Sequence, residues 1–277
     1  MNALSTLQGL TVAISISESD DMPALGLSLA HLQDAMTEIA RHLLALEAKL
    51  VYGGDLRANG FSTLMFELVA RHQSERDQHD QNNATAAVVN YLAWPVHIRM
   101  ESAALEKFDS DLAGIAKLQC LALDGTPLEL EQRLRQASHE PSDNEWETGL
   151  TAMRHTMRQA TQARVVLGGR VSNYKGSMPG IAEEALLSLQ AQQPLFVLGG
   201  FGGYARDIAQ TMGLVPAWAG SGPVWTGRDK FLAYGSDALN NGLTADENEV
   251  LVRTAHIDQA VILMLKGLLH PHAQARP

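Results

Sequence analysis

Three short apolar runs in this sequence each end in a pair of glycines. The pairs are Gly53-Gly54, Gly168-Gly169 and Gly199-Gly200, and each follows a run typical of a buried strand. A segment with helical periodicity comes after each pair. Parallel strands joined by helices have their carboxyl ends on the same edge of a sheet, where ligands bind. The sequence therefore predicts several glycine-bearing strand ends along one edge.

The spacing of apolar residues predicts an alternation of strands and helices along the chain. We expect strands at 11–17, 48–52, 86–92, 118–123, 164–167 and 194–198, and helices at 24–46, 61–72, 145–162, 179–192, 204–212 and 249–269. This alternation indicates the α/β class, with a Rossmann-like, open, mainly parallel sheet that has helices on both faces. We expect one domain over residues 1–277, with a core at about 9–213, an irregular loop at 219–249 and a C-terminal helix at 249–269.

The charge balance argues against nucleic acid as a partner. Lys and Arg total 21 against 31 Asp and Glu, which gives a formal net charge of −10. Non-specific nucleic-acid binding relies on clustered basic residues, and the sequence contains no basic run. A small anion needs only a local positive pocket, to which backbone amides contribute.

Nothing in the sequence predicts a membrane partner. The most apolar stretch, Ala260 to Leu269, is interrupted by Lys266 and is shorter than the roughly 20 residues of a membrane span. The N-terminus lacks the basic and small-residue features of a signal peptide. Cys120 is the only cysteine, which is typical of a reducing compartment. We therefore expect a cytoplasmic protein.

Several chemistries are excluded by missing motifs. No Gly-Lys-Ser/Thr follows a glycine pair, and the run Gly199-Gly200-Phe201-Gly202-Gly203 does not fit the dinucleotide fingerprint. The ten histidines form no HExxH pattern and no Cys/His cluster. We expect neither a metal nor a cofactor, and no Ser or Cys nucleophile of the usual kinds.

Two segments resemble a known superfamily. LVYGGDLRANGFSTLMFELVARH, residues 50–72, resembles the first loop and helix of the Lonely Guy-type phosphoribohydrolases and of lysine-decarboxylase-like and DprA-like proteins. MPGIAEEALLSLQ, residues 178–190, resembles their PGGxGTxxE loop and helix. The chain is thereby identified as similar to the SLOG superfamily, and to one of its prokaryotic clusters linked to nucleotide signalling. The resemblance implies a Rossmann-like fold that binds nucleotide-derived ligands such as ADP-ribose, or cleaves the N-glycosidic bond of nucleoside monophosphates.

Individual residues carry that resemblance. Gly53, Gly54 and Gly60 match the first loop, and Pro179, Gly180, Glu183 and Glu184 match the second. The second loop departs from the enzymes because it lacks their GxGT portion, which grips phosphate and places the catalytic acid. This departure favours binding over catalysis. If the protein is an enzyme, Glu183 and Glu184 are the candidate catalytic carboxylates, although acidic residues also favour the first turn of any helix.

Residues near the glycine pairs are the candidate ligand contacts. They are Ser15, Ser17, Asp55, Arg57, Arg170, Lys175, Arg206, Phe201 and Gly202, together with Gly53, Gly54, Gly168, Gly169, Gly199 and Gly200. The glycines allow a close approach of backbone to phosphate, and the arginines offer bidentate contacts to a diphosphate. The alternatives are tight turns and solvated surface cations. Tyr174, Trp218 and Trp225 are candidates either for covering a base or for anchoring a loop.

Three functions remain open at this point. The first is a protein that binds or senses a nucleotide-derived small molecule. The second is a nucleotide N-glycosidase in which Glu183 or Glu184 faces the anomeric carbon. The third is an assembly module with a vestigial site. The resemblance also implies a homo-oligomer, in which the apolar final helix forms an interface or is buried within its own domain.

Overall fold

A computed structural model gives the fold of this chain. It describes residues 6–54, 56–57, 60–76, 86–170, 172, 174–216 and 224–270, with backbone only at 73–76. Asp55 and Trp218, two of the residues singled out above, lie outside these ranges.

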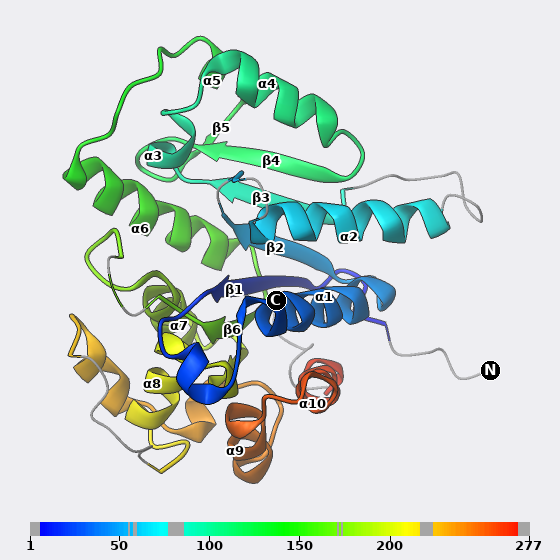
Figure 1. Ribbon diagram of the computed structural model, residues 1–277, viewed down its shortest axis with the longest axis vertical. Coiled ribbons are helices and arrows are strands. Elements are labelled where there is room, and N and C mark those ends of the chain that lie inside the picture. Colours follow the sequence, from blue (N-terminus) through cyan, green and yellow to red (C-terminus); the bar gives the residue numbers. More distant parts are fainter. Residues whose placement is uncertain are drawn as a thin grey trace.

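Seven strands of the described chain form one sheet in the order β5-β4-β3-β2-β1-β6-β7 (Figure 1). They are β1 (Thr11–Ser17), β2 (Lys49–Gly53), β3 (Val88–Leu92), β4 (Ala116–Leu121), β5 (Pro127–Leu128), β6 (Ala163–Gly168) and β7 (Leu195–Leu198). All neighbouring pairs are parallel except β4 with β5, in which Cys120 lies opposite Leu128. The predicted α/β fold, with an open and mainly parallel sheet, is confirmed.

Helices cover both faces of this sheet. They are α1 (Leu29–Ala45), α2 (Phe61–Arg76), α3 (Trp94–His97), α4 (Ser102–Asp111), α5 (Leu130–Leu134), α6 (Asp143–Gln159), α7 (Gly180–Gln190), α8 (Gly203–Thr211), α9 (Ala245–Arg253) and α10 (Ile257–Leu269). Short 3-10 turns are η1 (Met22–Leu25), η2 (Gly199–Phe201), η3 (Arg228–Ala233) and η4 (Ser236–Leu239). No described helix is long and apolar enough to cross a membrane.

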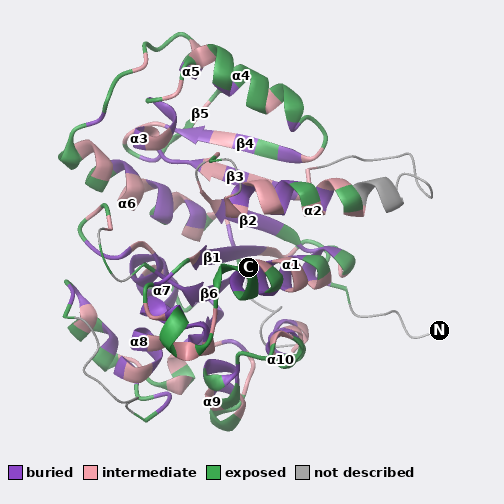
Figure 2. Ribbon diagram, in the orientation of Figure 1, coloured by how far each residue is buried: buried purple, intermediate pink, exposed green. Residues whose placement is uncertain are grey.

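Alternate strand residues face the two helical layers, as the pleat of a strand requires. Val12, Ile14 and Ile16 of β1 pack in one core cluster with α1, α2 and α10. Ala13 packs on the opposite face with Met153 and Met157 of α6, and α7 and α8 cover β6 and β7 on that side. Figure 2 shows the strands largely buried and the outer faces of the helices exposed.

The chain reverses its direction of travel across the sheet at β1. It moves from β1 through β2 and β3 to β4, and α6 then returns it to β6 on the other side of β1. In open parallel sheets, ligands bind at the strand ends beside such a reversal. The topology therefore points to the carboxyl ends of β1, β2 and β6.

Neither outer strand of the sheet offers a long exposed edge for pairing with another strand. At one edge β5 has only two residues, the first of which is Pro127. At the other edge α9 packs against β7, and the Asn241 side-chain Nδ2 donates a hydrogen bond of 2.9 Å to the Leu195 carbonyl oxygen.

The C-terminal part differs from the expected loop and single helix. Within the described part of 219–249, η3 and η4 are followed by α9, which begins at Ala245 with a capping box between Thr244 and Glu247. The chain is then extended at Thr254, where the hydroxyl oxygen accepts a 3.0 Å hydrogen bond from the His256 amide. This local bond competes with helix continuation, so α9 and α10 are separate helices.

Candidate functional site

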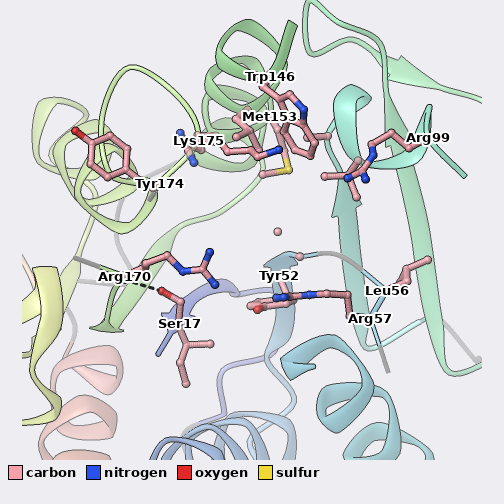
Figure 3. Close-up of a pocket in the computed structure, with 18 of the residues that line it drawn as sticks. Ser17, Tyr52, Leu56, Arg57, Arg99, Trp146, Met153, Arg170, Tyr174 and Lys175 are labelled. Atoms are coloured by element: carbon pink, nitrogen blue, oxygen red, sulfur yellow. Dashed lines mark hydrogen bonds between the residues drawn. The ribbon is translucent and has the colours of Figure 1, made fainter. Parts of the chain in front are cut away.

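A cavity of about 810 Å³ lies at the carboxyl ends of β1, β2 and β6, with β3 beside it (Figure 3). Strand ends and the loops after them supply its floor, and α3 and α6 supply its wall. Its described lining residues are Ile16, Ser17, Tyr52, Gly53, Gly54, Leu56, Arg57, Ala93, Val96, Arg99, Met100, Trp146, Leu150, Met153, Arg154, Arg170, Tyr174, Lys175 and Gly180. The volume is in the range of small-molecule sites.

The charges on this lining are of one sign. Five basic side chains contribute to it, and none of its described residues is an acid, although the whole chain carries a formal charge of −10. Arg154 is neutralised by an ion pair with Glu183. The remaining cations, Arg57, Arg99, Arg170 and Lys175, make the cavity a local positive region that attracts anions.

Two smaller chambers share residues with the cavity. One, of about 190 Å³, is lined by Ser17, Arg57 and Arg170 together with Glu18, Gln33 and Gly60 among others. The other, of about 180 Å³, reaches inward to Ser15, Arg154 and Glu184. Arg170 lines all three spaces, so it lies at their junction.

The Gly168-Gly169 pair positions Arg170. Gly168 has a φ of 65°, and a Cβ there would lie 2.2 Å from the Ser17 carbonyl oxygen, so the turn requires glycine. The Gly169 amide donates to that same oxygen at 2.9 Å, and the Arg170 amide donates to the Ser17 hydroxyl oxygen at 3.2 Å. Neither glycine is among the described lining residues. Their contribution is to direct the Arg170 side chain toward the cavity (Figure 3).

The Gly53-Gly54 pair lines the cavity directly. A Cβ at Gly53 would lie 2.6 Å from the Met157 sulfur, and one at Gly54 would lie 2.2 Å from the Tyr52 ring. The absence of side chains here lets α6 and the Tyr52 ring approach the strand end closely. Arg57 then follows in the same loop and lines the cavity with them.

Trp146, at the start of α6, lies between two cations. Lys175 Nζ is 3.9 Å from the centroid of its ring and Arg99 Cζ is 5.6 Å from it. Arg99 also pairs with Glu140 at 3.0 Å, in a pair whose side chains are 46% and 71% exposed. An aromatic face flanked by cations suits a base that carries phosphate.

The two candidate catalytic carboxylates are buried and paired with arginines. Glu183 accepts from Arg154 and, at 2.7 Å, from the Thr151 hydroxyl. Glu184 accepts from the Ser15 hydroxyl and, at 2.8 Å, from Arg164 Nη1. Burial lowers the pKa of the Arg164 guanidinium, and the Glu184 carboxylate opposes that shift. This network links α6, α7, β1 and β6; of the two carboxylates, only Glu184 is among the described residues of the chambers.

The third glycine pair is not part of the described cavity lining. A Cβ at Gly200 would lie 2.2 Å from the Thr254 carbonyl oxygen, and one at Gly199 would lie 3.0 Å from that of Val252. The first amide of α8, at Gly203, already donates to both carboxylate oxygens of Asp21, at 3.0 and 3.1 Å. The carboxylate of Asp21 therefore occupies the start of α8.

The neighbours of this third pair are also outside the lining. Phe201 is 1% exposed and belongs to the main core cluster. A Cβ at Gly202 would lie 2.8 Å from Asp21 Oδ1. Arg206 is half-buried, which lowers its pKa, and Asp21 opposes the shift. The ligand contacts predicted for Gly199, Gly200, Phe201, Gly202 and Arg206 stay untested predictions.

Some of the other predicted residues line the cavity and some do not. Tyr174 and Lys175 line the cavity, as does Gly180, where the Arg154 guanidinium lies 2.8 Å from the position of a Cβ. Pro179 is buried at the N-cap of α7. Trp225 is buried against α8 and outside the described cavity lining, and its indole Nε1 donates to Asp207 at 2.6 Å. No group of three or more potential metal ligands occurs among the described residues.

Sequence reasoning missed several lining residues. Arg99, Trp146 and Arg154 were not singled out, nor were Tyr52, Val96, Met100, Leu150 and Met153 as a cavity wall. Arg154 carried a signal, since it lies four residues after Leu150 and three before Met157, which places it on the same helix face as these two apolar residues. Arg99 and Trp146 carried none, because only the crossing of α6 over the strand ends brings them to the cavity.

His97 holds the wall on the β3 side. This histidine is fully buried, and its Nδ1 accepts a 2.9 Å hydrogen bond from Arg133 Nε while its Nε2 lies 2.8 Å from the Leu121 carbonyl oxygen. Burial lowers the pKa of His97 to about 4, and the Arg133 charge contributes to the shift. The imidazole is therefore neutral and fixes α3, which carries Val96 into the cavity.

The family assignment agrees with this geometry. The sequence model of the family described as SLOG cluster2 matches residues 6–233, which include β1 to β7 and every described lining residue of the cavity. This chain belongs to SLOG cluster2. Membership indicates a nucleotide-related function in general terms. No curated protein matches the chain.

Proposed function

We propose that this SLOG cluster2 protein binds or senses a nucleotide-derived small molecule in the 810 Å³ cavity. The observation that carries the proposal is the one-signed lining: Arg57, Arg99, Arg170 and Lys175 contribute cations, and no described lining residue is an acid. Arginine binds phosphate through two parallel hydrogen bonds.

The rest of the lining favours a ligand that contains a nucleoside over a bare inorganic anion. Trp146, Tyr52 and Tyr174 supply aromatic rings, and Leu150 and Met153 supply apolar contacts. Aromatic faces stack on any base. ADP-ribose-type molecules, NAD derivatives and nucleoside phosphates all combine a base with phosphate and fit this description.

Thermal unfolding with nucleoside monophosphates, NAD and ADP-ribose tests the proposal. A ligand at 100 times its dissociation constant adds about 2.7 kcal/mol, or roughly 5–10 °C for a chain of this size. We expect a shift with one ligand class, and its loss in the double variant Arg57→Ala/Arg170→Ala. Arg253→Ala is the control, because Arg253 lies in an exposed pair with Glu249. No shift with any ligand would overturn the proposal and favour an assembly module.

A second candidate is hydrolysis of the N-glycosidic bond, favoured by the single observation that Glu184 lines the inner chamber. Water would add to the anomeric carbon, and the base would leave with the bonding electrons and gain a proton. Free base released from a bound nucleotide, and lost in Glu184→Gln with binding retained, would support it. Release that persists in a Glu183→Gln/Glu184→Gln double variant would exclude these carboxylates as catalytic.

A further inference from the structure

The four cations of the cavity form two separate pairs. Arg57 and Arg170 lie at the strand ends, and both also line the 190 Å³ chamber. Arg99 and Lys175 gather at Trp146, at 5.6 and 3.9 Å from its ring centroid, and neither is a described lining residue of that chamber. Figure 3 shows the two pairs on opposite sides of the cavity.

Part of the cavity lining is uncharged. Val96, Met100, Leu150 and Met153 contribute apolar side chains to it, from α3, the turn after it and α6. Apolar and sulfur-containing side chains suit the faces of a base and a ribose. The lining of the cavity thus combines two separate groups of cations with apolar side chains.

Both ends are accessible to a ligand, because all four cations are exposed. Arg99 forms an ion pair with Glu140, and both side chains of that pair are largely exposed. Exposed ion pairs contribute little, so an incoming phosphate exchanges with Glu140 at small cost. Arg154 is different, because its charge is already matched by buried Glu183. Each end of the cavity can thus contribute to the free energy of binding a phosphate group.

We infer that the ligand is a nucleotide that carries two separated phosphate groups, one at the Arg57–Arg170 end and one at the Arg99–Lys175 end. The two adjacent phosphates of a nucleoside diphosphate would pair with the cations of one end only, and the cations of the other end would have no phosphate. The inference rests on the proposed function, which it refines by specifying where the charges of the ligand lie.

Calorimetric titration of the whole protein tests this arrangement with matched probes. The probes are adenosine 3′,5′-bisphosphate, ADP, ATP and AMP, together with the guanosine series. ADP has the same number of phosphates as the bisphosphate, and ATP controls for a larger total charge. We expect the bisphosphate to bind roughly tenfold or more tightly than either polyphosphate of the same base.

Two variants separate the ends. The double variant Arg99→Ala/Lys175→Ala should remove the advantage of the bisphosphate and leave AMP affinity within about twofold, because a single phosphate still binds at Arg57 and Arg170. Arg253→Ala again serves as the control. Equal affinity for bisphosphate, ADP and ATP, or an equal loss for all ligands in the double variant, would overturn this inference and leave the proposed function standing. Absence of binding by every probe would also overturn this inference, and it would overturn the proposed function as well if NAD and ADP-ribose likewise fail to bind.

Discussion

The strand ends of β6 and β7 have the same local sequence and different surroundings. Each is a Val-Leu-Gly-Gly run at the same edge of the sheet. After β6, the glycines turn the chain so that Arg170 reaches the cavity. After β7, Gly200 lies against the Thr254 carbonyl and Asp21 occupies the start of α8. The motif therefore makes a tight turn in both places, and the position of the strand decides whether the turn borders a cavity.

The end of β3 leads to the same conclusion, because this strand end has no glycine and still borders the cavity. Ala93 follows this strand without any glycine, yet Ala93 and Val96 line the cavity. β3 and β6 lie on either side of the central β1–β2 pair, whereas β7 is the outermost strand. Proximity to the reversal at β1 thus predicts the site better than glycine content does.

Gly200→Ala should have the largest effect on stability. The new Cβ would lie 2.2 Å from a backbone carbonyl oxygen that cannot rotate away, so we expect a loss of about 3 kcal/mol, at the upper end for an overpacked core. Urea unfolding measures this, and nucleotide affinity should not change. Gly235→Ala is the matched control, because nothing lies within 4 Å of its Cβ position. A stable Gly200→Ala variant would mean that the β7 end is open.

The stability of the protein should depend on pH through His97, which lies in α3 after the end of β3. Its pKa is about 4 in the folded protein and about 6.5 when unfolded. Below pH 6.5 the unfolded chain therefore binds a proton that the folded one does not, and stability falls until the pH reaches about 4. We expect a loss of about 2 kcal/mol between pH 7 and pH 5. The variant His97→Gln, which keeps a donor and an acceptor, should reduce this slope in urea unfolding; an unchanged slope would exclude His97 as its source.

Gly53→Ala places the same methyl group at an open strand end. Its nearest neighbour is the Met157 sulfur at 2.6 Å, and a flexible thioether moves more easily than a carbonyl. We expect a loss of about 1 kcal/mol in stability, with weaker nucleotide binding because Gly53 lines the cavity. A loss as large as that of Gly200→Ala would remove the distinction between the two ends.

Asp21→Asn should have the smallest effect. Asparagine still accepts the Gly203 hydrogen bond but removes the charge at the start of α8, so we expect about 0.5 kcal/mol of destabilisation. Affinity for nucleotides should stay unchanged in titration. A gain of nucleotide binding in this variant would show that Asp21 alone keeps ligands from the β7 end.

The regular part of the fold was predictable because its signals are local. A short β-rich run predicted Thr11–Ser17 with the observed bounds, and helix periodicity located the ends of α7 within two residues and those of α6 within three. Four elements, α3, α4, α5 and β5, were not anticipated, since four or fewer apolar positions carry no clear period. The break at Thr254 depends on one side-chain hydrogen bond and has no periodic signal either.

The site was predictable only in part. Residues that follow strand ends directly, such as Arg57 and Arg170, were found from their place in the chain. Arg99 and Trp146 come from α3 and α6 or the residues beside them, and reach the cavity through tertiary packing. The pairing of Glu183 and Glu184 with Arg154 and Arg164 joins residues about 20 to 30 positions apart and has no sequence motif.

The restricted outer strands have a consequence for self-association. An exposed strand edge is the usual template for joining sheets between copies and for aggregation. Here one edge strand has two residues, starting at Pro127, and the other is covered by α9 and bonded by Asn241. If copies of this chain associate, a continuous sheet formed through β5 or β7 of two copies is disfavoured.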